Sequence, residues 1–199
     1  MKIKMELLSD AIFGNGMSVP GGEDISVLRD MYGFPYYKGS TFKGVFREEL
    51  YRYLEWTQNP NPKKEVDRLL GFGGDDNVLN NDKIVFSDFC ISDKVKDIVL
   101  AEIGENQPDQ VLDACTHLRT FTSISEDGSV KEGTLRIGRC IDKGLCFYSE
   151  LNCQKKDEEL VIGVLKLIKW NDEKSWIWKS ENYHCKGVKE WLSTNILNT

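Results

Sequence analysis

The sequence contains no C-x-x-C pair and only two histidines. Its six cysteines are scattered, and His117 and His184 are far apart, so the spacing typical of a structural zinc site is absent. We therefore expect no zinc site. The cysteines are expected to be free thiols, several of them buried, as in a protein of the cytoplasm.

An apolar run long enough to cross a membrane is also missing. The first residues, 2–6, are too highly charged for a secretory signal peptide. The expected location is the cytoplasm, with no membrane partner.

Positive charge is in deficit, because 26 Lys and Arg residues face 32 Asp and Glu residues and the net charge is −6. Free nucleic-acid-binding proteins usually carry a basic balance, although an acidic chain still accommodates a local basic strip. With 199 residues, 40% of them hydrophobic, the chain is long enough for one domain with a sizeable core.

The clearest local pattern is a Gly-Ser turn that opens a helix. From Thr41 onward, apolar residues recur at helical spacing and predict one buried face, formed by Phe42, Val45, Phe46, Leu50, Tyr53 and Leu54. Ser40 or Thr41 is expected to cap this helix. Gly44 lacks a side chain and is expected to let another backbone come close.

Three cations surround this turn: Lys38 precedes it, and Lys43 and Arg47 share one helix face. Helix amides, the helix dipole and neighbouring cations together suit a phosphate group. The same residues also suit an ordinary capped helix with solvated cations, and their spacing alone does not decide between the two.

The order of motifs around this turn resembles the N-terminal signature of the RAMP superfamily, the CRISPR-associated RNA-binding proteins of type III effector complexes. The matching stretches are Asp24 to Asp30, Gly33-Phe34-Pro35-Tyr36, and Lys38-Gly39-Ser40-Thr41-Phe42-Lys43-Gly44-Val45-Phe46-Arg47. Two further stretches follow in the family's order, namely 69–74 with the strand pattern at 83–89, and 119–124 with 133–136. The resemblance implies RNA contacts through Lys38, Gly39, Ser40, Thr41, Lys43, Arg47, Arg119 and Arg136.

Asp24 occupies the position of the aspartate that the family's backbone subunits use to cleave target RNA. The resemblance therefore implies a catalytic role for Asp24, with Mg²⁺ or another divalent metal as its cofactor. A carboxylate is chemically suited to this, because it binds Mg²⁺ or positions a ribose 2′-hydroxyl. The alternative is a turn or capping role. Asp30 is a second candidate, but Arg29 beside it favours an ion pair or a solvated role.

A tight turn at residues 126–129 separates two extended runs and predicts a β-hairpin. In the RAMP family this hairpin is the thumb, which folds across the guide–target duplex; here its tip is short and acidic. Arg119 matches a family arginine near the RNA channel, and either a phosphate grip or an ion pair with a nearby carboxylate explains it.

The predicted fold class is α/β (α+β), with a ferredoxin-like or RRM-like βαββαβ core. We expect one domain over residues 1–199, with insertions at about 10–35, 56–82 and 92–134, the last including the hairpin thumb. Residues 92–115 are expected to form irregular helix and loop, and residues 188–197 a short closing helix. The family's glycine-rich C-terminal loop is replaced by 170–179, where Trp176 and Trp178 are expected to pack rather than to bind bases.

The resemblance implies a type III CRISPR effector subunit that binds guide RNA and oligomerises along it beside other RAMP subunits, with the complementary target RNA as a further partner. One alternative is a non-catalytic scaffold subunit with the same contacts. Another is a stand-alone enzyme that binds a phosphorylated small molecule at the 39–44 turn. A histidine-dependent ribonuclease of the superfamily is not expected, because neither histidine has a visible catalytic context in the sequence.

Overall fold

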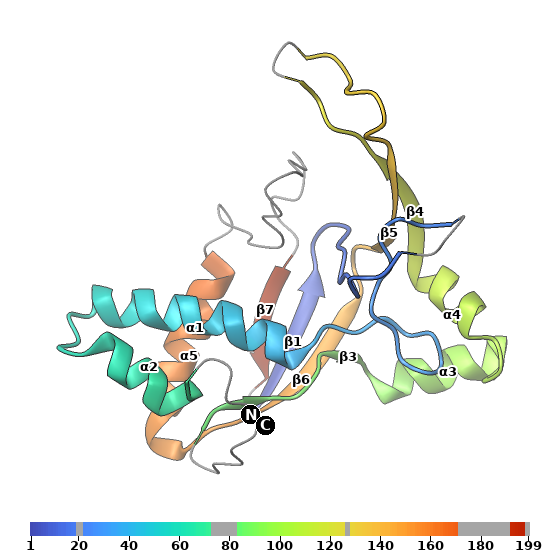
Figure 1. Cartoon of the computed structure of the whole chain (residues 1–199). Coiled ribbons are helices and arrows are strands. Elements are labelled where there is room, and N and C mark those ends of the chain that lie inside the picture. The colour runs from blue at the N-terminus through green and yellow to red at the C-terminus, as the bar shows by residue number, and fades with distance from the viewer. Residues whose placement is uncertain (19–21, 73–82, 126–127, 171–191, 198–199) are drawn as a thin grey trace.

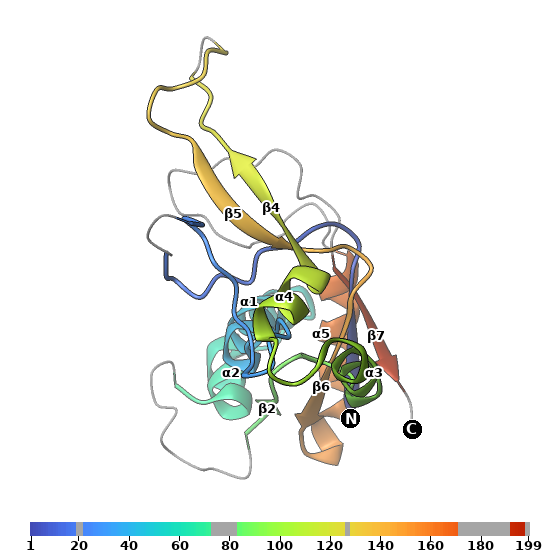
Figure 2. The ribbon, with the colours of Figure 1, turned by 90° about the vertical axis from the view of Figure 1, so that its right-hand side faces the viewer.

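The computed structural model describes residues 1–18, 22–72, 83–125, 128–170 and 192–197 (Figure 1). Its body is an antiparallel sheet with helices packed beside it, and a two-stranded arm projects away from this body (Figures 1 and 2). The predicted α/β class is confirmed. None of the helices described is long and apolar enough to span a lipid bilayer.

The main sheet is built around β1 (Lys2–Leu7) and β6 (Cys146–Asn152). Its strands follow the order β2-β6-β1-β7, and β3 also pairs with β6. All of these pairs are antiparallel. The remaining strands are β2 (Val85–Phe86), β3 (Cys90–Ile91) and β7 (Leu192–Leu197). Around this sheet the chain runs strand, helix, strands, strand, helix, strand. The ferredoxin-like assignment and the domain boundaries stay predictions.

Strand β1 has the alternation that its sequence predicts. Ile3, Met5 and Leu7 are buried, whereas Lys2, Lys4 and Glu6 are not. Period-two alternation of this kind places one face of a strand against a core and the other toward solvent. The register pairs Lys2 with Glu150 and Glu6 with Cys146.

Three helices lie at the side of this sheet: α1 (Gly39–Trp56), α2 (Pro62–Leu70) and α5 (Glu158–Trp170) (Figure 1). A short 3₁₀ turn, Lys155–Asp157, precedes α5. Helix α1 buries Phe42, Phe46, Leu50 and Leu54, which belong to the predicted face. The ring of Phe42 packs on those of Phe86 and Phe89, with centroids 5.2 and 4.7 Å apart. This aromatic cluster fixes α1 on the strands that follow it.

The connection from β3 to the arm contains two regular helices, α3 (Asp93–Ile103) and α4 (Pro108–Cys115). Helix and loop were expected over 92–115 and both are present, but the helices are regular, so the expected irregularity was wrong. The sequence pattern was weak because α3 buries none of its side chains fully, while α4 buries Val111, Leu112 and Cys115. A helix without a strongly buried stripe gives little periodic signal.

The predicted hairpin is present as β4 (Thr116–Phe121) and β5 (Arg136–Ile141). It forms the long arm that extends from the body in both views (Figures 1 and 2). The antiparallel register pairs Thr116 with Ile141 and Phe121 with Arg136. An isolated bridge between Ile124 and Val130 continues the pairing toward the tip.

The expected closing helix at 188–197 was wrong, because its described part is strand β7. This strand pairs with β1 over six positions, from Lys2 opposite Leu197 to Leu7 opposite Leu192. Pairing with a distant strand outweighs the local helical preference of the segment. The predicted roles of Trp176, Trp178 and His184 concern residues outside the described ranges. The five cysteines in the described ranges are free, and Cys115 and Cys140 are buried.

Tyr37 supplies a pH-dependent contribution to stability. Its side chain is buried against Phe13 and Phe89, and burial raises its pKa to about 12. An exposed tyrosine in the unfolded chain titrates near the ordinary value of about 10. Because the unfolded state loses this proton first, the contribution is complete below about pH 10 and is lost as the pH rises toward 12.

We expect Tyr37→Phe to remove this part of the pH dependence, which amounts to about 2–3 kcal/mol by pH 12. Urea unfolding of both proteins at pH 8, 10 and 11 measures it. The free energy of unfolding should fall more steeply above pH 10 in the native sequence than in the variant. Equal losses would show that Tyr37 ionises equally in both states.

Candidate nucleic-acid interface

The start of α1 differs from the predicted capping arrangement. The helix begins at Gly39, Lys38 is its N-cap residue, and no side chain of the N-cap residue caps it. The expectation that Ser40 or Thr41 caps the helix was therefore wrong, and both are exposed residues of its first turn. Asp88 supplies the acceptor instead, because the Gly39 amide donates to its Oδ1 at 2.8 Å. The carboxylate of Asp88 thus accepts the hydrogen bond of the first backbone amide of the helix.

Gly39 also marks the place where two backbones approach closely. A Cβ atom there would lie 2.4 Å from the carbonyl oxygen of Phe86 and 2.6 Å from that of Ser87. A Cβ atom at Gly44, which is exposed, would meet nothing within 4 Å. The prediction that another backbone approaches Gly44 was therefore wrong for this chain. The backbone of residues 86 and 87 approaches Gly39 instead, and Gly44 borders open space.

The three cations near this turn have different surroundings. Lys38 is exposed, whereas Lys43 and Arg47 are half-buried. The guanidinium of Arg47 donates to the carbonyl of Gly71 at 2.7 Å and lies 3.6 Å from the carboxylate of Asp67. Arg47 thus donates to a carbonyl group at the C-terminal end of α2. A positive charge is stabilised at this end of a helix by the helix dipole. Arg47 therefore joins α1 to α2.

Asp24 lies beside the arm and is exposed. Its amide donates to the carbonyl of Ile137 on β5 at 2.7 Å, and its Oδ2 accepts from the amide of Ile137 at 2.8 Å. The next residue, Ile25, bridges Gly138 in parallel. The carboxylate is consequently held at a fixed place on the arm by main-chain bonds, while one face of it meets solvent.

An arginine on β5 anchors the segment that carries Asp24. Arg139 forms ion pairs with Glu23 at 2.8 Å and with Asp113 of α4 at 2.6 Å. Burial opposes the charge of Arg139, but hydrogen bonds to Asp113 and Glu23 outweigh it and raise the pKa of the guanidinium. Within the described ranges, Asp24 belongs to no group of three metal-ligating side chains.

Asp30, the second candidate carboxylate, uses both of its oxygens in contacts within the protein. Its Oδ1 accepts from the amides of Tyr32 and Phe34, both at 3.0 Å. Its Oδ2 pairs with the ammonium group of Lys96 at 2.7 Å. Asp30 thus closes a turn and fixes α3 to it, with Lys96 rather than Arg29 as its partner.

One face of the arm combines cations with an aromatic ring. Cross-strand register places Arg119 opposite Gly138 and Phe121 opposite Arg136, and alternation puts Arg119, Phe121 and Arg136 on the same face. Both arginines are exposed, and the guanidinium of Arg119 lies 5.8 Å from the centre of the Phe121 ring. Among the described residues no carboxylate forms an ion pair with Arg119, so the ion-pair alternative has no partner there.

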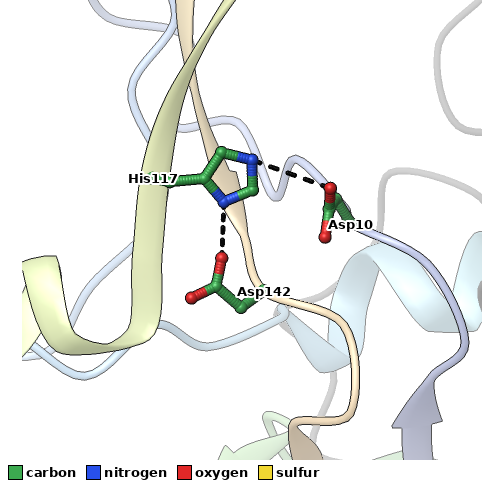
Figure 3. A group of neighbouring side chains, drawn as sticks. All are labelled: Asp10, His117 and Asp142. Carbon is green, nitrogen blue, oxygen red and sulfur yellow. Dashed lines mark hydrogen bonds and ion pairs between the residues drawn. The ribbon is translucent and has the colours of Figure 1, made fainter.

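A cluster missed in the sequence surrounds His117 at the base of the arm. Its imidazole lies between the carboxylates of Asp10 and Asp142 (Figure 3). These residues come from three distant parts of the sequence, and only the pairing of β4 with β5 and of Ala11 with Ile141 brings them together. No local motif in the sequence indicates such a cluster.

Comparison with known proteins supplies a family and a fold. The family model of the RAMP superfamily matches residues 4–187. A chain of the type III-B Cmr-β complex bound to cognate target RNA superposes with a TM-score of 0.57 at 15% identity, covering 97% of this chain and 95% of that one. A chain of the apo Cmr-β complex gives 0.52 at 14% identity, covering 84% and 88%. No curated protein matches the sequence.

Proposed function

Because the chain belongs to the RAMP superfamily, we propose that it is a subunit of a type III CRISPR effector complex that binds guide RNA along its arm and the start of α1. The observation that carries this proposal is the arm face of Arg119, Phe121 and Arg136, which ends beside Asp24. Exposed arginines contact phosphates, and an aromatic ring beside them stacks on a base. The net charge of −6 is compatible with this picture, because an acidic chain accommodates a local basic strip.

The start of α1 contributes the second group of contacts. Lys38, Ser40 and Thr41 are exposed on its first turn, and Lys43 lies one turn further along. We assign the phosphate contacts to these side chains rather than to the amide of Gly39, which already donates to Asp88. The same hydrogen bond argues against a stand-alone small-molecule phosphate site at this turn. Arg47 acts here as a positioning residue that holds α2 against α1.

Cleavage of the paired target RNA is the finer part of the proposal and depends on Asp24. Mg²⁺ commonly binds through one or two carboxylates together with substrate phosphates. The exposed carboxylate of Asp24, held at a fixed place on the arm, suits this mode of coordination, with RNA phosphates supplying further ligands. When bound, the ion would stabilise negative charge on the phosphate that is attacked.

The assembly is part of the proposal as well. The superposed chains come from Cmr-β complexes, one bound to cognate target RNA. We infer that this chain likewise packs beside other RAMP subunits or further copies of itself along the guide RNA, with the target RNA paired to that guide.

Binding to labelled single-stranded RNAs of increasing length tests the proposal. We expect affinity to rise with length, and Lys38→Ala and Arg119→Ala each to weaken binding about 3- to 10-fold. Each variant should also lower the salt dependence by about 0.7 in the slope of log K against log salt, the value for one lost phosphate contact with a single strand.

Lys94→Ala is the matched control, because Lys94 is also an exposed lysine but lies on α3, away from the arm. It removes the same charge and should leave affinity unchanged. Affinity that ignores RNA length, or that falls equally in all three variants, would contradict the proposed interface.

A further inference from the structure

The cluster at the base of the arm has the composition of a metal site. The Nδ1 atom of His117 lies 2.5 Å from Oδ1 of Asp142, and its Nε2 atom lies 3.6 Å from Oδ2 of Asp10 (Figure 3). One ligand atom from each residue lies within 4.8 Å of the other two. The three side chains are 44%, 43% and 31% exposed for His117, Asp142 and Asp10, so an ion from solvent reaches them.

Main-chain bonds hold the three residues in place. Ala11 and Ile141 exchange two hydrogen bonds of 3.0 and 2.7 Å, which fixes Asp10 next to Asp142. The amide of Asp142 donates to the carbonyl of Cys115, two residues before His117, at 3.1 Å. Asp10 uses its other oxygen, Oδ1, to accept from the amide of Lys143 at 3.2 Å. Oδ2 of Asp10 therefore remains directed at the imidazole, and the ligands are pre-organised by the sheet and the arm.

We propose that Asp10, His117 and Asp142 form a binding site for a divalent first-row transition metal such as Mn²⁺ or Zn²⁺. The ion binds between Nε2 of His117 and the carboxylate of Asp10, and water completes its coordination. Asp142 accepts a hydrogen bond from Nδ1 and thereby orients the ring, as carboxylates commonly do for histidine ligands. Imidazole favours transition metals over Mg²⁺, which prefers oxygen ligands. The proposal departs from the expectation of no zinc, which considered only local sequence spacing.

This site is separate from Asp24. Asp24 is hydrogen-bonded to Ile137, and Asp142 lies five residues further along the same strand direction. At about 3.4 Å per residue, the two positions are roughly 17 Å apart. The ion would join the loop after β1 to strand β4 of the arm, and its role is to fix the arm on the sheet rather than to reach RNA at Asp24.

A Mn²⁺ titration of the full chain, followed by the EPR signal of the free ion, tests the site. Mn²⁺ is chosen because thiolates compete for it poorly, and the chain carries six cysteines. Asp24→Asn is present in every sample, so that Asp24 contributes no binding. We expect about one ion per chain, an affinity at least tenfold weaker in His117→Gln and Asp10→Asn, and a 10- to 100-fold weakening in Asp142→Asn.

Asp97→Asn is the control, because Asp97 is an exposed aspartate on α3. It should leave Mn²⁺ uptake unchanged, and thermal melts in EDTA check that each variant is folded. A second readout is hydrogen exchange at Thr116–Phe121, which Mn²⁺ should slow in the Asp24→Asn protein and not in His117→Gln. An absence of uptake, or uptake that His117→Gln and Asp10→Asn leave unchanged, would overturn the site and leave His117 as a link between two carboxylates.

Discussion

Replacing Asp24 with asparagine is expected to lower the rate of target RNA cleavage by about 10²-fold or more, the scale of a lost acid–base or metal-binding carboxylate. Asparagine keeps the shape of the side chain and an oxygen that accepts from the Ile137 amide, so the segment beside β5 should stay in place. What the variant loses is the negative charge. Because the proposed contacts at Lys38 and Arg119 are unchanged, RNA should still bind.

The measurement uses the effector complex assembled with guide RNA, a labelled complementary target and Mg²⁺. Asp97→Asn on α3 is the matched control and should cleave at the native rate. If Asp24→Asn also cleaves at the native rate, Asp24 is not catalytic in this chain. If no sample cleaves although the target is bound, the chain is a non-catalytic scaffold subunit, and the RNA contacts of the proposal are unaffected.

The second large effect is expected at Gly39, where alanine should destabilise the fold by about 2–4 kcal/mol. The added Cβ would lie 2.4 and 2.6 Å from two carbonyl oxygens of the backbone, which a side-chain rotation does not relieve. Either α1 or the chain after β2 must shift. Such a shift would also break the hydrogen bond from the Gly39 amide to Asp88.

Gly44→Ala, in the same helix, is expected to stabilise the fold rather than to destabilise it. Its Cβ meets nothing within 4 Å, and alanine favours helix over glycine by about 0.5–1 kcal/mol, so this variant should be more stable than the native protein. Urea unfolding followed by circular dichroism gives both values. Equal destabilisation by the two substitutions would mean that the close approach at Gly39 is absent in solution.

The sequence predicted the elements whose pattern is local. Buried alternation in β1 and the helical stripe of Phe42, Phe46 and Leu50 in α1 were read correctly, as was the hairpin from its turn residues. Strand β7 was mistaken for a helix, since its structure follows from pairing with β1, nearly two hundred residues earlier. The helix expected over 92–115 was taken as irregular, whereas α3 is regular; it gives little periodic signal because it has no strongly buried face.

For the site, the sequence located single residues but not their partners. It named Asp24, Lys38 and Arg119 as candidates without predicting their surroundings, and the structure finds all three exposed. The carboxylate of Asp88 at the start of α1 was not predicted, nor was the attachment of Arg47 to α2. These contacts join residues 49 and 24 positions apart, a separation at which no periodic pattern operates.

The bonds between Asp24 and Ile137 have a mechanical consequence. The carboxylate is attached to one of the two strands that make the arm, and the arm reaches well beyond the body (Figure 2). The carboxylate of Asp24 is therefore coupled to the arm, so that a displacement of β5 displaces it as well.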